Sequence, residues 1–275
     1  MLKEAVQVRP RDDDGAPVGG CGGPQERRRH AGAPGSAAPH RADTAETLAA
    51  ALRGAAPEEV PGRLCSVAVE LLPVAGASVS LRSEGLPVLV GASDETAAGM
   101  AEMQATLGEG PCACAAETTE PVLAGDLTAG PDVARWPVYA HEATAAGVRA
   151  AYSLPLGDAV VCVGTLDLYG TGPGELAGPD LHTARLLASA LTVALMSLPR
   201  GEEEVGRSGG FWLGGLTAEH DEIHQAIGMI MAQLGVGADE ALARLRGHAF
   251  ACGRTALEAA HDVVGHRRRF DDDSL

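Results

Sequence analysis

Few side chains in this sequence are spaced as metal-binding or redox groups are. The best candidates are Cys112 and Cys114, which are separated by one residue and could belong to a metal or thiol-redox site. A zinc site normally needs two further nitrogen or sulfur ligands at suitable spacing, and the nearest downstream histidine is His141. The favoured interpretation places Cys112 at a tight turn and Cys114, as a small buried residue, on the helix that follows. We therefore expect no metal and no other cofactor, with a redox role as the alternative.

Other catalytic patterns are missing from the sequence. It contains no glycine-rich phosphate loop, no nucleophile elbow and no paired-carboxylate motif, so we expect the protein not to be an enzyme. Asp126, Asp132 and His141 fall in the segment that we expect to cover a sheet. They could line a ligand cavity, although surface loop positions are the simpler interpretation. The candidate ligand-binding residues are Cys112, Asp126 and His141.

The charge balance narrows the classes of partner. Among 275 residues, 21 are basic and 37 acidic, which gives a net charge of −16 and argues against a general coat for nucleic acid or anionic membranes. The longest nearly apolar stretch without a charge, Leu186 to Leu198, is shorter than the roughly 18–20 residues that span a bilayer. The first residues contain no apolar core typical of a signal peptide. We expect a cytoplasmic protein that does not contact a membrane.

Composition shifts along the chain predict two domains. Residues 42–198 mix helical and strand periodicities, whereas residues 217–270 show helical periodicity alone. The remaining segments are an N-terminal part expected to be disordered (1–41), a glycine-rich linker (199–216) and an acidic tail (271–275).

The front domain is predicted to be α+β. Period-two alternation over 79–90 and over 148–169 predicts two hairpins, and a helix capped by Asp94 is expected over 94–107. Further helices are expected over 57–72 and 179–198. Strands joined by hairpins favour an antiparallel sheet with flanking helices over a doubly wound fold.

The C-terminal module is predicted to be a small bundle of three helices. Thr217 is the expected N-cap of the first helix, Asp239 or its neighbour opens the second, and Thr255 caps the third. Apolar residues recur at helical spacing in the first helix: Ile223, Ile227, Ile230, Met231 and Leu234. Helices this short are not stable alone in water, so mutual packing or dimerisation must hold them.

These three blocks resemble a known family. His224 to Met231 (HQAIGMIM), Asp239 to Arg246 (DEALARLR) and Glu258 to Val264 (EAAHDVV) look like an ANTAR domain, the three-helix RNA-binding module of bacterial antitermination regulators. The front domain is similar to the GAF domains that are fused to such modules. Its resemblance is carried by the following segments: Gly108 to Cys112 (GEGPC), Trp136-Pro137, Ala150 to Leu156 and Val163 to Tyr169.

The resemblance implies a function. Proteins built this way are expected to sense a signal, such as a small-molecule ligand, through the GAF domain. They are expected to bind tandem stem-loops in nascent RNA through a dimer of ANTAR modules. Binding of the protein then favours the tandem stem-loops over a competing terminator structure in the RNA, so that transcription continues. Two loop contacts held together bind more tightly than either alone, and loops expose base edges that an A-form duplex hides.

Candidate RNA-binding residues follow from the resemblance and from charge. They are Gln225, Arg244, Arg246, Arg254, Arg267 and Arg268. The module carries six arginines against seven acidic residues over 217–270, so it is not a basic surface. The alternative is therefore a GAF-type ligand or redox sensor, or a scaffold, whose helical bundle serves only dimerisation or protein docking. In that case the arginines would be ordinary solvated residues.

Overall fold

The computed structural model describes residues 46–82, 86–158, 161–196 and 211–270, all of which belong to one compact unit. The segments expected to be a disordered N-terminus and an acidic tail lie outside the described residues. So does the part of the expected linker before residue 211.

A five-stranded antiparallel sheet organises the front domain, as the hairpin pattern predicts. Its spatial order is β2-β1-β5-β4-β3. The strands are β1 (Gly76–Leu81), β2 (Val88–Ala92), β3 (Val122–Ala124), β4 (Ala150–Gly157) and β5 (Cys162–Gly170). The central strand β5 pairs with β1 on one side and with β4 on the other.

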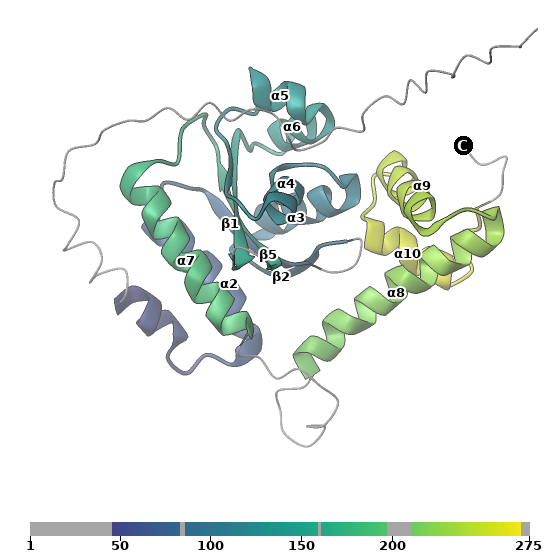
Figure 1. Cartoon of the computed structure of the whole chain (residues 1–275), viewed down its shortest axis with the longest axis horizontal. Helices are drawn as coiled ribbons and strands as arrows, with labels where there is room; N and C mark the ends of the chain where they lie inside the picture. The colour runs from purple at the N-terminus through teal and green to yellow at the C-terminus, as the bar shows by residue number, and fades with distance from the viewer. Residues whose placement is uncertain (1–45, 83–85, 159–160, 197–210, 271–275) are drawn as a thin grey trace, which may run out of the picture. The chain divides into compact units, whose positions relative to one another are not determined.

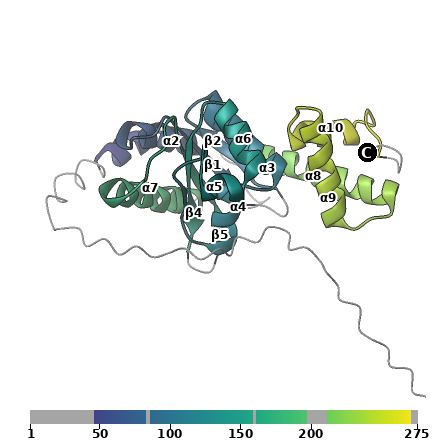
Figure 2. The ribbon, with the colours of Figure 1, turned by 90° about the horizontal axis from the view of Figure 1, so that it is seen from above.

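Helices cover both faces of the sheet. Figures 1 and 2 show α2 and α7 along one face and α3, α4 and α6 on the other. The elements are the 3-10 turn η1 (Pro57–Glu59) and helices α2 (Val60–Leu71), α3 (Glu95–Leu107), α4 (Pro111–Thr118), α5 (Pro131–Arg135), α6 (Pro137–Ala145) and α7 (Gly178–Met196). The α+β prediction is confirmed.

The two sheet faces differ in chemistry. Strand residues such as Val79, Leu154 and Leu166 pack with Leu64 of α2 and Leu187 of α7 in one apolar cluster. Because side chains alternate across a strand, their neighbours in sequence face the helices on the other side. The apolar core therefore lies between the sheet and the α2–α7 layer.

Local signals at the ends of α3 act as the sequence predicts. The Asp94 carboxylate accepts a hydrogen bond from the Ala97 amide, at 3.0 Å, and so caps the helix. At the other end Gly108 adopts φ 70°, and its amide donates to the Gln104 carbonyl. This left-handed position favours glycine and ends the helix where the next turn begins.

The C-terminal module comprises α8 (Phe211–Leu234), α9 (Ala238–Ala251) and α10 (Ala256–Val264). Helix α8 begins six residues before Thr217, so the prediction of an N-cap at Thr217 is wrong. Thr255 does cap α10, in a capping box with Glu258. Buried residues from all three helices, including Ile230, Leu245 and Val263, form the core of the bundle.

Candidate functional site

Small polar residues line the sheet face below α3, α4 and α6. Five of them are at most 4% exposed: Ser78, Ser80, Ser153, Thr165 and Asp167. They alternate with the apolar residues that face α2 and α7, such as Val79 and Leu166. A buried face made of hydroxyls and a carboxylate cannot serve as an ordinary apolar core, because each polar group needs a hydrogen-bond partner.

Asp167 is the centre of this polar face. Its carboxylate accepts hydrogen bonds from the Ser153 hydroxyl and, at 2.9 Å, from the Thr165 hydroxyl. Burial raises the pKa of Asp167 to about 6, although both hydrogen bonds favour the charged form. The same carboxylate contributes, after burial, to raising the pKa of the Cys112 thiol and of the Tyr139 and Tyr169 hydroxyls. At neutral pH these groups are protonated around a carboxylate that titrates near pH 6.

The turn between α3 and α4 fixes a second part of the site. The Gln104 side-chain carbonyl accepts a hydrogen bond from the Cys112 amide, at 2.9 Å. Gly110 adopts φ 129°, and a Cβ atom there would lie 2.6 Å from Gln104 Oε1. Glycine is therefore needed at Gly110 both for the backbone conformation and for the close approach of Gln104.

A cavity of about 220 Å³ opens beside this turn. Its lining includes side chains from the sheet, from α3 and α4, and from α9 of the C-terminal module: Ser80, Arg82, Gln104, Cys112, Thr165, Glu117 and Arg246. Gln104 is 1% exposed, and its side-chain nitrogen Nε2 has no hydrogen-bond partner within the described part of the chain. A buried donor without an acceptor is costly, so the cavity is suited to a ligand that supplies one.

The structure separates the three predicted ligand-binding residues. Cys112 lines the cavity beside the turn as a buried free thiol. Asp126 lines a different and more open hollow, of about 780 Å³, together with Asp132 and Tyr152. His141 lies on the exposed side of α6 and lines neither hollow. Within the described residues, no group of three or more His, Cys, Asp and Glu side chains could hold a metal ion.

Sequence reasoning missed Gln104, Arg82 and Asp167. Signals for one of them were present: Asp167 interrupts an apolar strand, and Ser78 and Ser80 alternate with Ala77 and Val79 in β1. Reading that alternation as a polar face would have placed Asp167 there, since β5 pairs directly with β1. No local signal identifies Gln104, whose role depends on the turn folding back over its side chain.

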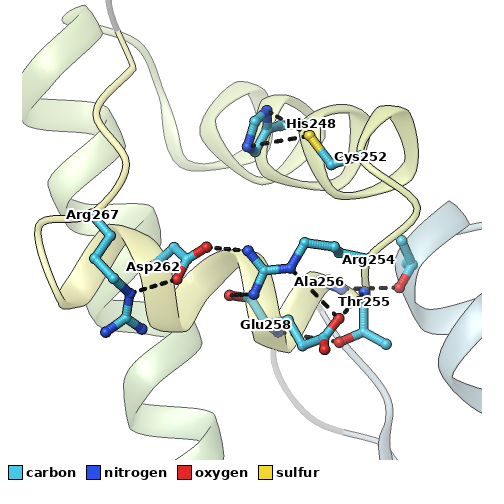
Figure 3. A network of polar contacts seen from close by, with 9 residues as sticks. His248, Cys252, Arg254, Thr255, Ala256, Glu258, Asp262 and Arg267 are labelled. Atoms are coloured by element: carbon cyan, nitrogen blue, oxygen red, sulfur yellow. Dashed lines mark hydrogen bonds and ion pairs between the residues drawn. The ribbon is translucent and has the colours of Figure 1, made fainter.

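Three predicted RNA-binding arginines make ion pairs. Arg254 and Arg267 both bind the Asp262 carboxylate, and Figure 3 shows them on either side of it. Arg244 binds Glu240 one turn earlier on α9, at 2.9 Å. Each guanidinium thus has an acidic neighbour within the module.

The other three candidates differ from these. Gln225 is exposed on α8. The Arg268 guanidinium lies 5.6 Å from the centroid of the Phe270 ring. Arg246 turns toward α3, where its Nε donates to the Ala105 carbonyl at 3.2 Å. The structure therefore does not gather the six residues into one open basic surface.

Fold and site together define an α+β domain with a polar, hollowed sheet face, followed by a small helical module. Comparison with protein families gives both a name: the GAF domain model matches residues 54–196 and the ANTAR domain model matches residues 217–264. The first match covers more than half of the chain, which therefore belongs to the GAF domain family and carries an ANTAR domain behind it. Both are regulatory domains, and the resemblance seen in the sequence is confirmed.

Two solved structures are similar to part of this chain. The GAF domain of a phosphoenolpyruvate-protein phosphotransferase from Coxiella burnetii is 17% identical, with a TM-score of 0.46, over 58% of this chain and 95% of that chain. Free methionine-R-sulfoxide reductase from Neisseria meningitidis, in complex with its substrate, is 19% identical, with a TM-score of 0.44, over 61% and 94%. No curated protein matches the chain.

None of the described helices alone has the length and apolar character needed to cross a bilayer. The segments Asp221–Leu234 and Ala238–Ala251 reach the threshold only as a pair, and they are bent by 104° at their junction.

Proposed function

We propose that the protein is a cytoplasmic, RNA-binding regulator of transcription antitermination, in which the GAF domain senses a small ligand and controls the ANTAR domain. The observation that carries this proposal is the ANTAR match over residues 217–264 directly behind a GAF domain. ANTAR domains bind RNA and GAF domains bind small ligands, so both partners follow from the families. A homodimer would present two ANTAR modules to two stem-loops.

The ion pairs of the arginines are compatible with RNA binding. The Arg254 and Arg267 side chains are 38% and 55% exposed, and exposed ion pairs contribute only about 0–1 kcal/mol each. An RNA phosphate can therefore replace the Asp262 carboxylate at small cost, because the guanidinium exchanges one oxyanion for another. The other candidates remain proposed RNA contacts because of the family resemblance and, for the arginines, their charge. They are Gln225, Arg244, Arg246 and Arg268.

A gel-shift experiment with the full chain tests the proposal. The probe is a tandem stem-loop RNA with two hexaloops, and the control RNA keeps both stems but has scrambled loops. We expect tighter binding to the intact loops, because unstacked bases carry the readable edges. Equal affinity for the two RNAs would refute loop recognition.

Substitution of Asp262 tests where the RNA binds. Asp262→Asn releases Arg254 and Arg267 from their shared carboxylate, and we expect RNA binding to become about fivefold tighter. Asp239→Asn is the matched control, since it removes one negative charge from an exposed position at the start of α9. An equal gain in both variants would assign the effect to net charge, and no gain in Asp262→Asn would place the RNA elsewhere.

The near-neutral charge of the module supports a second candidate, in which the protein is a ligand sensor or scaffold. Six arginines face seven acidic residues over 217–270, and three of the arginines are ion-paired within the module. The ANTAR helices would then serve only dimerisation or protein docking. Sedimentation at low and high salt separates the two: a salt-insensitive dimer without RNA affinity favours the scaffold.

A further inference from the structure

A hollow of about 550 Å³ lies on the surface of the ANTAR domain. Its described lining comes from one side of α8 and from the segment that follows α10: Met229, Ala232, Gln233, His266, Arg268 and Arg269. Ligand-binding pockets of proteins usually have volumes of roughly 300–1,000 Å³. The hollow is therefore large enough to receive one building block of a larger ligand.

The segment after α10 forms one wall of this hollow. His266 adopts φ 56°, a left-handed backbone conformation that is uncommon for residues other than glycine. The chain turns there and reaches α8, where the Phe270 amide donates a hydrogen bond to Gln233 Oε1 at 2.8 Å. Phe270 is 6% exposed and belongs to the core of the helical bundle. The wall is therefore fixed to α8 at its far end by both polar and apolar contacts.

Helix α8 supplies an apolar floor and a hydrogen-bond donor. Met229 and Gln233 are four residues apart and so share one face of the helix, and Met229 packs against the bundle core. Ala232 is exposed and small, which leaves the hollow open. The Gln233 oxygen is held by the Phe270 amide, so the side-chain nitrogen Nε2 is the group that Gln233 offers to a ligand. Within the described residues Nε2 has no hydrogen-bond partner.

Arg268 supplies the positive charge. Its guanidinium lies 5.6 Å from the centroid of the Phe270 ring, and its buried Nε has no hydrogen-bond partner in the described part of the chain. It makes no ion pair with any described residue, in contrast to Arg254 and Arg267. Arg269 also lines the hollow but already makes another interaction, so the site depends on Arg268. The described lining contains no acidic residue, and its charge is therefore positive.

We propose that this hollow receives one unstacked nucleotide of the RNA loop, with the base against Met229 and Gln233 and a phosphate at Arg268. Loops present bases that are splayed out of the helix, and such bases pack on protein side chains and form hydrogen bonds through their edges. Gln233 Nε2 can donate to a base carbonyl or ring nitrogen, and a guanidinium binds a phosphate through paired N–H donors. A positive hollow whose described lining lacks acids suits a polyanion. The inference rests on the proposed function and gives RNA recognition a definite place on the ANTAR domain.

Filling the hollow tests this placement. Ala232→Leu places a larger apolar side chain in it without a change of charge, and Ala243→Leu is the matched control at an exposed position of α9 that does not line the hollow. In gel shifts with the full chain, Ala232→Leu should weaken binding of the tandem stem-loop RNA about tenfold, because one base loses its contacts. It should also reduce the preference for intact over scrambled loops. Ala243→Leu should bind as the wild-type chain does. Equal affinities of the two variants would overturn the inference.

Removing the charge of Arg268 tests the phosphate contact. Arg268→Gln should weaken RNA binding at low salt and lower the slope of log affinity against log salt concentration by roughly 0.7 to 1, because one phosphate contact is lost. Arg185→Gln is the matched control, since it removes one positive charge from an exposed position on α7 of the GAF domain. Circular dichroism verifies that each variant is folded, and the Ala232→Leu result decides alone if Arg268→Gln does not fold. An unchanged slope in folded Arg268→Gln, or an equal change in both variants, would overturn the role of Arg268.

Two further outcomes separate the alternatives. Sedimentation velocity without RNA should give both leucine variants the oligomeric state of the wild-type chain. A change in Ala232→Leu alone would assign the hollow to a contact between two copies of the chain and overturn the inference. If the wild-type chain binds the RNA and both Ala232→Leu and Arg268→Gln bind it equally well, the inference fails and the proposed function stands. If the wild-type chain does not bind the RNA, the proposed function fails and the inference fails with it.

Discussion

Asp167 makes the stability of the protein depend on pH. Its pKa of about 6 in the folded state lies above the value of about 3.9 in an unfolded chain. Between these values the folded state binds more protons, so the stability that Asp167 contributes is greatest below about pH 4 and is lost as pH rises through 6. Asp167→Asn cannot titrate and can still hydrogen-bond Ser153 and Thr165. We expect it to gain roughly 3 kcal/mol relative to wild type between pH 4 and pH 7.

Urea unfolding at several pH values, followed by fluorescence of the buried Trp136, measures this difference. Asp126→Asn is the control, because hydrogen bonds from Thr128 lower the pKa of that carboxylate. The stability that the Asp126 carboxylate contributes is present at pH values above its pKa in the unfolded chain. This stability is lost as the pH falls through the lower pKa of the folded state. Relative to wild type, Asp126→Asn should therefore lose stability as pH rises. Parallel pH profiles for the two variants would contradict this assignment.

At the scale of elements, two glycines in adjoining segments should respond oppositely to alanine. Gly110→Ala places a Cβ atom against Gln104 at φ 129° and should destabilise the protein by about 1–3 kcal/mol. Gly99 lies at an exposed position inside α3, and a Cβ atom added there would have no neighbour within 4 Å among the described residues. Gly99→Ala should stabilise by about 0.5–1 kcal/mol through helix propensity. Urea titration of both variants provides the measurement, and changes of the same sign would contradict the argument.

Periodicity predicted most elements because apolar residues recur along the strands and helices here at the spacing of one face. The β1–β2 and β4–β5 hairpins, the Asp94 cap and the Thr255 cap all follow from residues close in sequence, whereas the β1–β5 pairing joins strands that are far apart in it. The start of α8 was not predicted. Gly214 and Gly215 favour a linker, yet their unfavourable propensity of about 1 kcal/mol each is offset once a long helix propagates from residues downstream.

The candidate site was less predictable than the fold, for a reason of geometry. Cys112 could be singled out because it lies in a recognisable turn. The cavity around it, however, combines Arg82, Gln104 and Arg246, and Arg246 lies 142 residues after Gln104 in the sequence. Such a combination depends on how an ANTAR helix packs against a GAF helix. No local pattern of residue types encodes that packing.

For the whole molecule, the contact between the two domains is specific as well as apolar. The Ala256 amide, at the start of α10, donates a buried hydrogen bond to the Thr106 hydroxyl on α3, at 3.0 Å. Leu86 and Ala105 of the GAF domain pack with the core of the ANTAR bundle. A backbone amide in the first turn of a helix has no hydrogen-bond partner within that helix. The Thr106 hydroxyl therefore accepts from an Ala256 amide that would otherwise be buried without a hydrogen bond.

Thr106→Val should therefore weaken the link between the domains. It retains the side-chain shape but removes the acceptor, which leaves the Ala256 amide unpaired at a cost of about 1–3 kcal/mol. Thr106→Ser keeps the hydroxyl and should behave nearly as wild type. Calorimetry of the full chain should show the ANTAR helices melting at a lower temperature in Thr106→Val, with little change in the GAF transition. Identical melting of the valine and serine variants would mean that the two domains are held together by apolar packing alone, because the hydrogen bond would then contribute nothing to their union.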